Sequence, residues 1–292
     1  MELSWINTFL IAAKCGNFRQ TAELLYISQP SVSVHIKLLE KELGVKLFFR
    51  EGKRVKLTEE GIRYLEHATK LIDFYQRGIE DLQSFSQGFT TKLSLAVSPL
   101  IADTIFPFIL KTYLQRNPQV EISIKILESV EIENAVLNDE VDMGLSCLSS
   151  THADLNSEML YNDKVILVVP HDGRDSESAP PLDEEDFLRT NFILTHNHPD
   201  YWDGLSRKIK NFYPNARMMK VSQVHISKRF ISEGLGVSFL PISTVRRELL
   251  EGSLLEVPCH SFTLPEAYTY AIMKYKHSKQ EDFLSFLSSY RI

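Results

Sequence analysis

Residues 17–44 read NFRQTAELLYISQPSVSVHIKLLEKELG, and this stretch predicts two helices joined by a tight turn. Ser28 can cap the second helix by accepting a backbone N–H bond, and Pro30 fits its first turn, where the missing N–H costs nothing. That helix has one apolar face, because apolar residues recur at steps of four, three and four: Val32, Ile36, Leu39 and Leu43. The pattern predicts a helix-turn-helix whose second helix buries one face and exposes the other.

The exposed face of this second helix carries side chains suited to DNA. Short polar residues at a helix N-terminus, followed by a cation, are what a helix inserted into the major groove needs. We therefore expect DNA contacts from Arg19 in the preceding helix and from six residues of this one: Gln29, Pro30, Ser31, Ser33, Val34 and Lys37.

The segments around this stretch complete a winged helix-turn-helix. Ser4 is expected to cap a first helix that ends at Gly16, and Asn17 to cap the next. Further on, strand-like runs at residues 45–50 and 54–58 predict a β-hairpin, the wing of such a domain.

The wing is basic, with Arg50, Lys53 and Arg54 in or beside its turn. Such residues are often simply solvated. Directly after a helix-turn-helix, however, they are more typical of contacts with phosphates or the minor groove. We assign residues 1–58 to a winged helix-turn-helix DNA-binding domain.

The distribution of charge supports this assignment. The formal net charge of −6 over the whole chain argues at first against nucleic acid, because phosphate binding needs cations. Residues 1–58 nevertheless carry +4, and the remaining residues carry −10. A basic module attached to an acidic body indicates that only the N-terminal part binds DNA.

Composition narrows the class of protein. No run approaches the roughly 20 apolar residues of a membrane span, and the N-terminus lacks the pattern of an export signal. A soluble, cytoplasmic protein without a membrane partner is expected. The three cysteines, Cys15, Cys147 and Cys259, are widely spaced and predict neither a disulfide framework nor a zinc site.

Residues 59–89 predict a long linker helix. Thr58 can cap it, and the acidic residues Glu59 and Glu60 suit the positive end of the helix dipole. A heptad seam of apolar residues runs along it: Leu65, Ala68, Ile72, Tyr75, Ile79 and Leu82. The seam could pack against the chain's own body, but its narrowness favours pairing with a second copy. Such a dimer would set the spacing of two DNA half-sites.

From residue 90 onward, short strands alternate with helices, which is typical of a doubly wound α/β sheet. A helix is expected at residues 101–115, and the strand that opens the second half at residues 165–169. We predict two α/β lobes joined by crossing strands, as in periplasmic binding proteins. Lobe I comprises residues 90–161 and 267–292, and lobe II comprises residues 162–266. Ligands of such folds bind at the carboxyl ends of the strands, between the lobes.

A longer motif runs through the N-terminal part. It comprises Phe18, Ala22, Leu25, Ser28, Gln29, Pro30, Ser31, Ser33, Ile36, Leu39, Glu40, Leu43, Gly44, Leu47, Phe48 and Arg50, followed by Leu57, Thr58 and Gly61. This ordered set resembles the N-terminal signature of LysR-type transcriptional regulators. Residues 233–241, EGLGVSFLP, also resemble that family's effector domain, so the resemblance covers the full length.

Two segments refine the resemblance. SPLIAD at residues 98–103 and THNHPDYW at residues 195–202 resemble regulators of cysteine and citrate-synthase genes. The chain departs from the family pattern at Thr21, where alanine is commoner, and at Val34 and His35, where a long polar or cationic pair is often found. Val34 and His35 are expected to face or flank the groove. The base sequence recognised by other members of the family therefore cannot be assigned to this chain.

The resemblance implies a transcriptional regulator that binds double-stranded promoter DNA. It further implies a tetramer, built from two dimers that share linker helices, and a small-molecule effector that changes the arrangement of the DNA-binding domains. The effector must bind one arrangement better than another, because otherwise it shifts nothing. The resemblance also allows RNA polymerase as a partner of the regulator. No cofactor is implied.

The effector site is expected where two helices of lobe I begin. Ser98 and Ser129 place hydroxyls and free backbone N–H groups at helix N-termini, where anions bind, although each alone could be a plain cap. We expect a carboxylate or sulfur oxyanion near Ser98, Pro99, Leu100, Ser129 and Cys147 of lobe I and near Thr195, His196, His198, Gln223 and His225 of lobe II.

Other interpretations of these residues remain open. The three histidines could bind zinc, but their spacing favours cationic or hydrogen-bonding partners of an anion, or structural contacts. Cys147 could sense redox state or simply be a small buried residue. The main alternative for the whole chain is a solute-binding protein without a transcriptional role. An enzyme is not expected, because no nucleophile, phosphate-loop or zinc-protease motif stands out.

Overall fold

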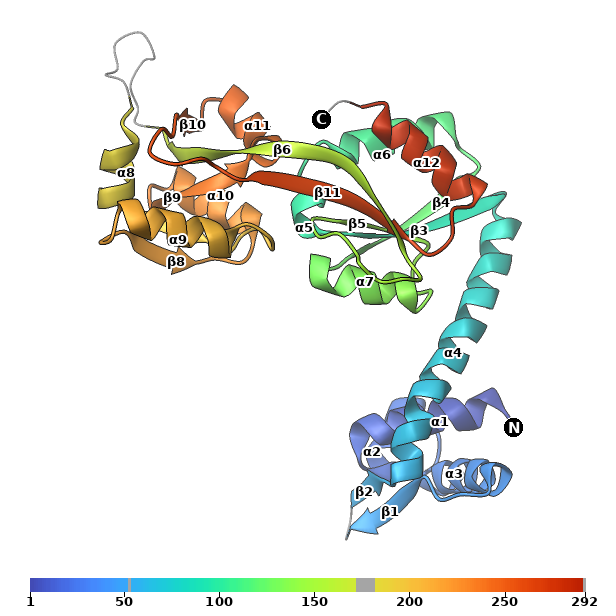
Figure 1. Cartoon of the computed structure of the whole chain (residues 1–292). Helices are drawn as coiled ribbons and strands as arrows, with labels where there is room; N and C mark the ends of the chain where they lie inside the picture. The colour runs from blue at the N-terminus through green and yellow to red at the C-terminus, as the bar shows by residue number, and fades with distance from the viewer. Residues whose placement is uncertain (52–53, 172–181, 291–292) are drawn as a thin grey trace. The chain divides into compact units, whose positions relative to one another are not determined.

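The computed structural model describes residues 1–51, 54–171 and 182–290, and gives only the backbone of Arg50 and Asp81. The chain forms two units, Met1–Gly88 and Phe89–Ile292, and each has its own hydrophobic core. Figure 1 traces the elements within each unit. Among the described helices, none is both long and apolar enough to span a membrane.

The first unit is a winged helix-turn-helix followed by a long helix. Its elements are α1 (Leu3–Cys15), α2 (Phe18–Leu25), α3 (Gln29–Leu43), β1 (Phe48–Glu51), β2 (Arg54–Leu57) and α4 (Glu59–Ser86). The two strands pair antiparallel, with Phe48 opposite Leu57. The predicted wing is therefore confirmed, although its first strand begins three residues later than expected.

Three predicted helix caps are confirmed by their hydrogen bonds. The Asn17 Oδ1 atom accepts the N–H of Arg19 at 2.9 Å, and the Thr58 Oγ1 atom accepts that of Gly61 at 2.9 Å. Ser28 Oγ accepts the N–H of Ser31 at 3.2 Å. Each bond satisfies a donor that the first turn of a helix would otherwise leave unpaired.

The predicted cap of the first helix is wrong. Helix α1 begins at Leu3, with Glu2 as the flanking residue, so Ser4 lies inside its first turn. The Ser4 hydroxyl donates to the Glu2 carboxylate at 3.1 Å instead of accepting a backbone N–H.

The apolar face of α3 forms the centre of the first core. Val32, Ile36 and Leu39 are buried, and they pack with residues of α1, α2 and α4. The ring of Phe9 lies 5.5 Å from that of Phe48, a contact that joins α1 to the wing. Aromatic pairs at this spacing add to the burial of their surface.

One buried carboxylate fastens α3 to the wing. Glu40 is 8% exposed, and its Oε1 atom accepts the N–H of Leu47 at 3.0 Å and that of Phe48 at 3.4 Å. Its Oε2 atom pairs with Lys46 Nζ at 2.6 Å. Hydrogen bonds to a charged group contribute about 1.5–3 kcal/mol each, so Glu40 holds the end of α3 firmly against β1.

The heptad seam of α4 divides into two parts. Ala68 is buried in the first core, and Leu65 and Ile72 pack against it. The proximal half of the seam therefore packs within the chain and not against a second copy. The distal half exposes a stripe of apolar side chains: Leu71, Phe74, Tyr75, Leu82 and Phe85.

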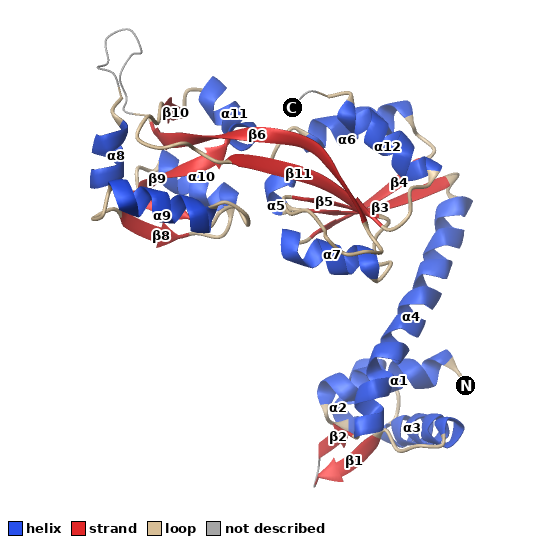
Figure 2. Cartoon of the chain, in the orientation of Figure 1, coloured by secondary structure: helices blue, strands red, loops and turns tan. Residues whose placement is uncertain are grey.

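The second unit alternates strands and helices, as Figure 2 shows. Its elements are β3 (Thr91–Val97), α5 (Pro99–Ala102), α6 (Phe106–Arg116), β4 (Val120–Ile126), α7 (Ser129–Leu137), β5 (Met143–Ser146), β6 (Asn156–Pro170), α8 (Glu184–Thr190), β7 (Phe192–Thr195), α9 (Trp202–Phe212), β8 (Arg217–Lys220), α10 (Val224–Ser232), β9 (Gly236–Pro241), α11 (Ile242–Leu250), β10 (Leu254–Val257), β11 (Glu266–Met273) and α12 (Ser278–Ser288).

The strands build two lobes that share β6 and β11. The strand order is β4-β3-β5-β11-β6-β9-β7-β8, with β10 also paired to β6. Lobe I holds the parallel strands β3, β4 and β5, and lobe II holds the parallel strands β7, β8 and β9. The antiparallel pair of β6 and β11 runs between the lobes (Figure 1).

Side chains that alternate along β6 face two different hydrophobic clusters. Val165, Leu167 and Val169 of β6 face one cluster, which also holds Trp202 and Phe239. Ile166 and Val168 face the opposite cluster, which continues into lobe I. This division follows from the period of two along a strand, which sends successive side chains to opposite faces.

Several predicted bounds in this unit are wrong. The helix expected at residues 101–115 is two helices, α5 and α6, separated by a turn in which the Thr104 hydroxyl donates to the Ile101 carbonyl at 2.6 Å. The strand expected at residues 165–169 is the distal third of β6, and α8 and β10 were not expected. The first part of β6 is half exposed and polar, so it lacks an apolar run.

Candidate DNA-binding surface and effector site

The turn between α2 and α3 presents a polar surface to solvent. Gln29, Pro30 and Lys37 are exposed, as is Val34, and Ser31 and Ser33 are partly exposed. The Gln29 Nε2 atom donates to the Ser33 hydroxyl at 3.0 Å, one helical turn away. Hydroxyl and amide side chains are therefore already aligned along the exposed face of α3.

Ser31 and Arg19 also make contacts within the domain. The Ser31 hydroxyl lies 2.7 Å from that of Ser28, the cap of α3. The Arg19 Nε atom lies 3.3 Å from a Glu23 carboxylate oxygen, and both side chains are well exposed. An exposed pair of this kind is worth little, so Arg19 can exchange Glu23 for another anion at small cost.

His35 does not flank the exposed face, which corrects the expectation from the sequence. Its Nδ1 atom lies 2.9 Å from the Thr8 hydroxyl, and the side chain is half buried against α1. Val34, in contrast, is exposed. The one-residue step along a helix turns neighbouring side chains by about 100°, which separates the two.

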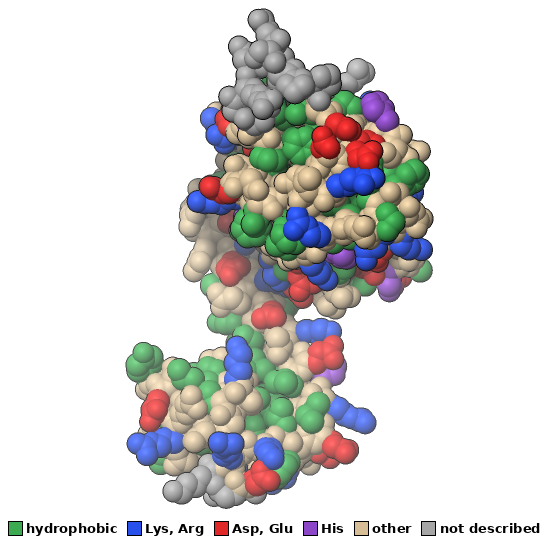
Figure 3. Space-filling view, turned by 90° about the vertical axis from the view of Figure 1, so that its left-hand side faces the viewer, with side chains coloured by type: hydrophobic (Ala, Val, Ile, Leu, Met, Phe, Trp, Pro, Cys, Tyr) green, Lys and Arg blue, Asp and Glu red, His purple; other side chains and the backbone are tan. Residues whose placement is uncertain are grey.

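The wing places at least one cation at the surface. Arg54 is exposed at the start of β2 and forms no ion pair with the described residues. Lys53 lies outside the described residues, and only the backbone of Arg50 is given. On the face shown in Figure 3, Lys and Arg side chains stand out over the unit that holds the winged helix.

In lobe I, the structure brings together three of the predicted effector-site residues. The Ser98 hydroxyl lies 3.7 Å from the Cys147 sulfur, and the Cys147 N–H donates to the Ser129 hydroxyl at 3.1 Å. All three side chains are buried. Pro99 and Leu100 follow Ser98 in the first turn of α5.

The environment of Cys147 disfavours its thiolate. Burial raises the pKa of the Cys147 thiol to about 11, against the smaller opposing effect of hydrogen bonds from Ser98 and Ser129, and the carboxylates of Asp200 and Glu128 add to the rise. A thiol with such a pKa stays protonated at neutral pH.

Ser129 is not a plain helix cap, which was the alternative to an anion-binding role. It is the first residue of α7, and Glu128 flanks the helix, with its N–H donating to the Glu131 carboxylate at 3.2 Å. Ser98 does flank α5, but its side chain caps no backbone N–H. Both hydroxyls are therefore turned toward Cys147 instead of toward their own helices.

In lobe II, His196 and His198 lie in different surroundings. His196 has a positive φ of 64°, and its Nδ1 atom lies 2.8 Å from the Thr195 hydroxyl. His198 is buried beside Tyr201, and burial lowers its pKa to about 3. The His198 Nδ1 atom accepts the N–H of Asp200 at 3.2 Å, whereas its buried Nε2 atom has no partner in the described residues. His198 is thus neutral and can act only through hydrogen bonds.

Sequence reasoning missed Asn197, which organises this part of lobe II. Its Oδ1 atom accepts the indole N–H of Trp202 at 2.8 Å, and its Nδ2 atom donates to the hydroxyls of Ser227 at 3.1 Å and Ser238 at 2.9 Å. Asn197 lies within the motif at residues 195–202, but nothing in the motif marks this amide as the buried member.

Polar side chains of the described residues link the two lobes at two places. The Gln223 Nε2 atom donates to Glu128 Oε1 at 2.7 Å. The side chain of Lys228 is 11% exposed, and its Nζ atom lies 2.8 Å from Asp103 of lobe I and 2.8 Å from Glu248 of lobe II. Lys228 also donates to the Thr244 carbonyl at 2.9 Å. A lone lysine inside a helix gave no signal of this role.

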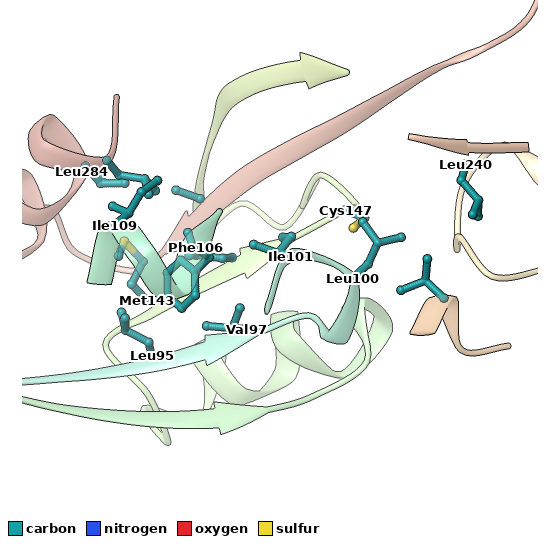
Figure 4. Packing of buried hydrophobic residues seen from close by; sticks show 14 of the residues in the cluster. Leu95, Val97, Leu100, Ile101, Phe106, Ile109, Met143, Cys147, Leu240 and Leu284 are labelled. Carbon is teal, nitrogen blue, oxygen red and sulfur yellow. The ribbon is translucent and has the colours of Figure 1, made fainter. Parts of the chain in front are cut away.

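Apolar side chains continue the contact between the lobes. Leu100 and Cys147 of lobe I belong to the same buried cluster as Val224 and Leu240 of lobe II. Figure 4 shows Leu100, Cys147 and Leu240 at one end of this cluster. Two predicted effector-site residues flank Val224 in the sequence: Gln223, which is partly buried, and His225, which is exposed.

The predicted residues do not form a group that could bind a metal ion. Within the part of the chain that the structure describes, no three His, Cys, Asp or Glu side chains lie close enough together to hold one. A small cavity in lobe I is lined by Thr104, Tyr161 and Thr269 together with apolar residues, but its volume of about 10 Å³ is room for a single water.

Comparison with known proteins identifies the family. Residues 3–62 match the family described as bacterial regulatory helix-turn-helix protein, lysR family, and residues 86–290 match the LysR substrate binding domain. The chain belongs to the LysR family of transcriptional regulators. It is therefore a DNA-binding transcriptional regulator and not an enzyme, and the alternative of a solute-binding protein without a transcriptional role is set aside.

Similar LysR-type proteins cover almost the whole chain. The HTH-type transcriptional regulator CitR of Bacillus subtilis (strain 168) is 48% identical over 290 residues, which are 99% of each chain. The B. subtilis protein YxjO, described as an uncharacterized HTH-type transcriptional regulator, is 36% identical over 99% of this chain and 98% of its own.

Solved LysR-type structures share the fold. Full-length CbnR in complex with its target DNA superposes with a TM-score of 0.72 at 19% identity and covers 99% of this chain and 98% of its own. DarR of Vibrio fischeri, also in complex with DNA, has a TM-score of 0.62 at 21% identity and covers 100% of this chain and 99% of its own.

The thiols provide a test of the redox interpretation of Cys147. Burial raises the pKa of Cys259 to about 12, so at pH 8 both it and Cys147 remain protonated, whereas Cys15 is partly exposed. We expect a thiol-reactive chromogenic disulfide to modify at most one cysteine of the folded protein within minutes at pH 8, and all three in concentrated guanidinium. The rapid phase should persist in Cys147→Ser. Its disappearance in that variant would establish Cys147 as a reactive thiol.

Proposed function

We propose that this LysR-type regulator recognises an operator in its own upstream region by placing α3 in the DNA major groove. The observation that carries the proposal is the exposed face of α3, where Gln29, Ser33 and Lys37 follow a capped N-terminus. Recognition helices contact bases with their N-terminal residues. Arg54 on the wing supports the complex by contacting the sugar-phosphate backbone. The protein acts in the cytoplasm, with RNA polymerase as a further partner.

The division between base contacts and phosphate contacts can be measured. We expect Gln29→Ala or Ser33→Ala to weaken specific binding by roughly 1–3 kcal/mol, because amide and hydroxyl groups read base edges. Arg54→Ala should weaken binding to all duplexes similarly. Fluorescence anisotropy at physiological salt, with the upstream duplex and a random one, measures both effects.

Two internal checks accompany that experiment. Because Gln29 donates to Ser33, the double variant should lose less than the sum of the single ones. Arg246→Ala removes an exposed arginine of the second unit and serves as the control for charge. An equal loss of specificity in the Gln29, Ser33 and Arg54 variants would contradict the proposed division.

We further propose that the distal half of α4 pairs with α4 of a second copy, and that two such dimers form a tetramer. The support is the exposed apolar stripe, on which Phe74 is 77% and Leu82 is 67% exposed. Burying a leucine side chain is favourable by about 1.5–3 kcal/mol, so the stripe favours a partner over contact with water.

A charged residue within the stripe should break this pairing. We expect Leu82→Glu to lower the mass observed by sedimentation velocity and to weaken binding to a duplex with two half-sites while sparing one half-site. The control, Gln83→Glu, adds the same charge at a neighbouring exposed position off the stripe. Unchanged assembly of Leu82→Glu would rule out this interface.

The effector proposed here is a small metabolite with a carboxylate or sulfur oxyanion, bound between the lobes. The support is the group of neutral donors: the hydroxyls of Ser98 and Ser129 and the His198 Nε2 atom, which has no partner among the described residues. Thr195, His196, Gln223 and His225 belong to the lobe II side of this proposal. Because Lys228 is already paired with two carboxylates, the anion would be held by hydrogen bonds and not by an ion pair.

Ligand binding should appear as thermal stabilisation. We expect at least one member of a panel of carboxylates and sulfur oxyanions to raise the melting temperature, since ligand at 100 times its Kd stabilises by about 2.7 kcal/mol. Ser98→Ala should reduce the shift, whereas Ser123→Ala, on the exposed part of β4, should not. Equal shifts in wild type and Ser98→Ala would place the anion elsewhere.

A further inference from the structure

Tyr26 lies in the turn between α2 and α3 and has no role in the core. The residue is 96% exposed, and it forms no hydrogen bond through its side chain and no ring contact with the described part of the chain. A tyrosine normally buries part of its ring when it stabilises a fold. Its presence here is therefore not explained by packing.

The backbone at Tyr26 makes this residue type more unusual. Tyr26 ends α2 with φ 54° and ψ 38°, in the left-handed region, where a side chain is strained. The other two helices of the domain that end in this conformation do so at glycines, Gly16 with φ 61° and Gly44 with φ 72°. The turn itself is well formed, because the Ile27 N–H donates to the Ala22 carbonyl at 3.0 Å. Folding alone would favour glycine or asparagine at this position.

The position of Tyr26 relative to α3 suggests what it contacts. It precedes Ser28, the cap of α3, by two residues. In a helix-turn-helix the N-terminus of the second helix enters the major groove while the first helix crosses the backbone, so a side chain in the turn lies at the rim of the groove. Tyrosine hydroxyls are among the groups that bind phosphate oxygens there.

We propose that the Tyr26 hydroxyl donates a hydrogen bond to a phosphate oxygen at the rim of the groove and so fixes the register of α3. This inference rests on the proposed docking of α3. Because a phosphate contact carries no base information, Tyr26 contributes to affinity for any duplex and leaves the choice of sequence to Gln29 and Ser33.

The test uses the full chain and the variants Tyr26→Phe and Tyr26→Asn. The first keeps the ring and removes the hydroxyl, and the second removes both while relieving the strained backbone. We expect both variants to bind the upstream duplex and a random duplex about tenfold more weakly, as for the loss of one hydrogen bond to a charged group. Tyr26→Asn should melt at the same or a higher temperature than wild type.

Other outcomes overturn the proposal. Wild-type affinity of both variants would show that Tyr26 touches no DNA, and wild-type affinity of Tyr26→Phe alone would show a contact through the ring. A loss restricted to the upstream duplex would indicate base recognition, and a lower melting temperature of Tyr26→Asn would indicate a folding role. Tyr275→Phe, at an exposed tyrosine of the second unit, controls for loss of a hydroxyl. If wild type binds the upstream and random duplexes equally well, the proposed operator recognition is wrong. The affinity of the Tyr26 variants for the random duplex still tests the phosphate contact in that case.

Discussion

The second unit depends on one pair of antiparallel strands that both lobes share. Along the pair, Glu266 of β11 lies opposite Lys164 of β6, and Met273 lies opposite Asn156. The register shifts between Thr269 and Tyr270, where β6 contributes one extra residue, Leu160. An extra residue bends a strand and increases its twist. Any change in the angle between the lobes has to pass through this pair, because β6 and β11 are the strands that both lobes share.

The links between the lobes oppose that change unequally. The bond from Gln223 to Glu128 is exposed, so water can replace it with little loss. Lys228 is nearly buried and holds Asp103 of lobe I while also bonded to Glu248 and the Thr244 carbonyl of lobe II, so this link resists separation more than the exposed one. The two links therefore differ in strength, and the weaker one lies on the Gln223 side.

The first unit was largely predictable because its signals are local. Asn17, Ser28 and Thr58 cap helices through bonds to residues two or three positions away, and the wing follows from a short hairpin pattern. The errors in the second unit have the opposite origin. The length of β6 depends on partners about 100 residues distant, and the Ser129 hydroxyl bonds the backbone N–H of Cys147, which follows β5, instead of its own helix. Candidate site residues could be named from the sequence, but their contacts could not.

Glu40 illustrates how much a single long-range contact can change the meaning of a residue. In the sequence it belongs to the family motif, but the pattern does not say what its carboxylate contacts. In the fold its carboxylate accepts the N–H groups of Leu47 and Phe48, so α3 and β1 move as one body. Gly61 adds to this rigidity, because a Cβ there would meet the Leu47 carbonyl oxygen at 2.2 Å and push α4 away. The exposed face of α3 and the cation of the wing are thus presented to DNA in one fixed geometry. In the proposed docking, a base contact by α3 and a phosphate contact by the wing would reinforce each other, because forming one places the other in register.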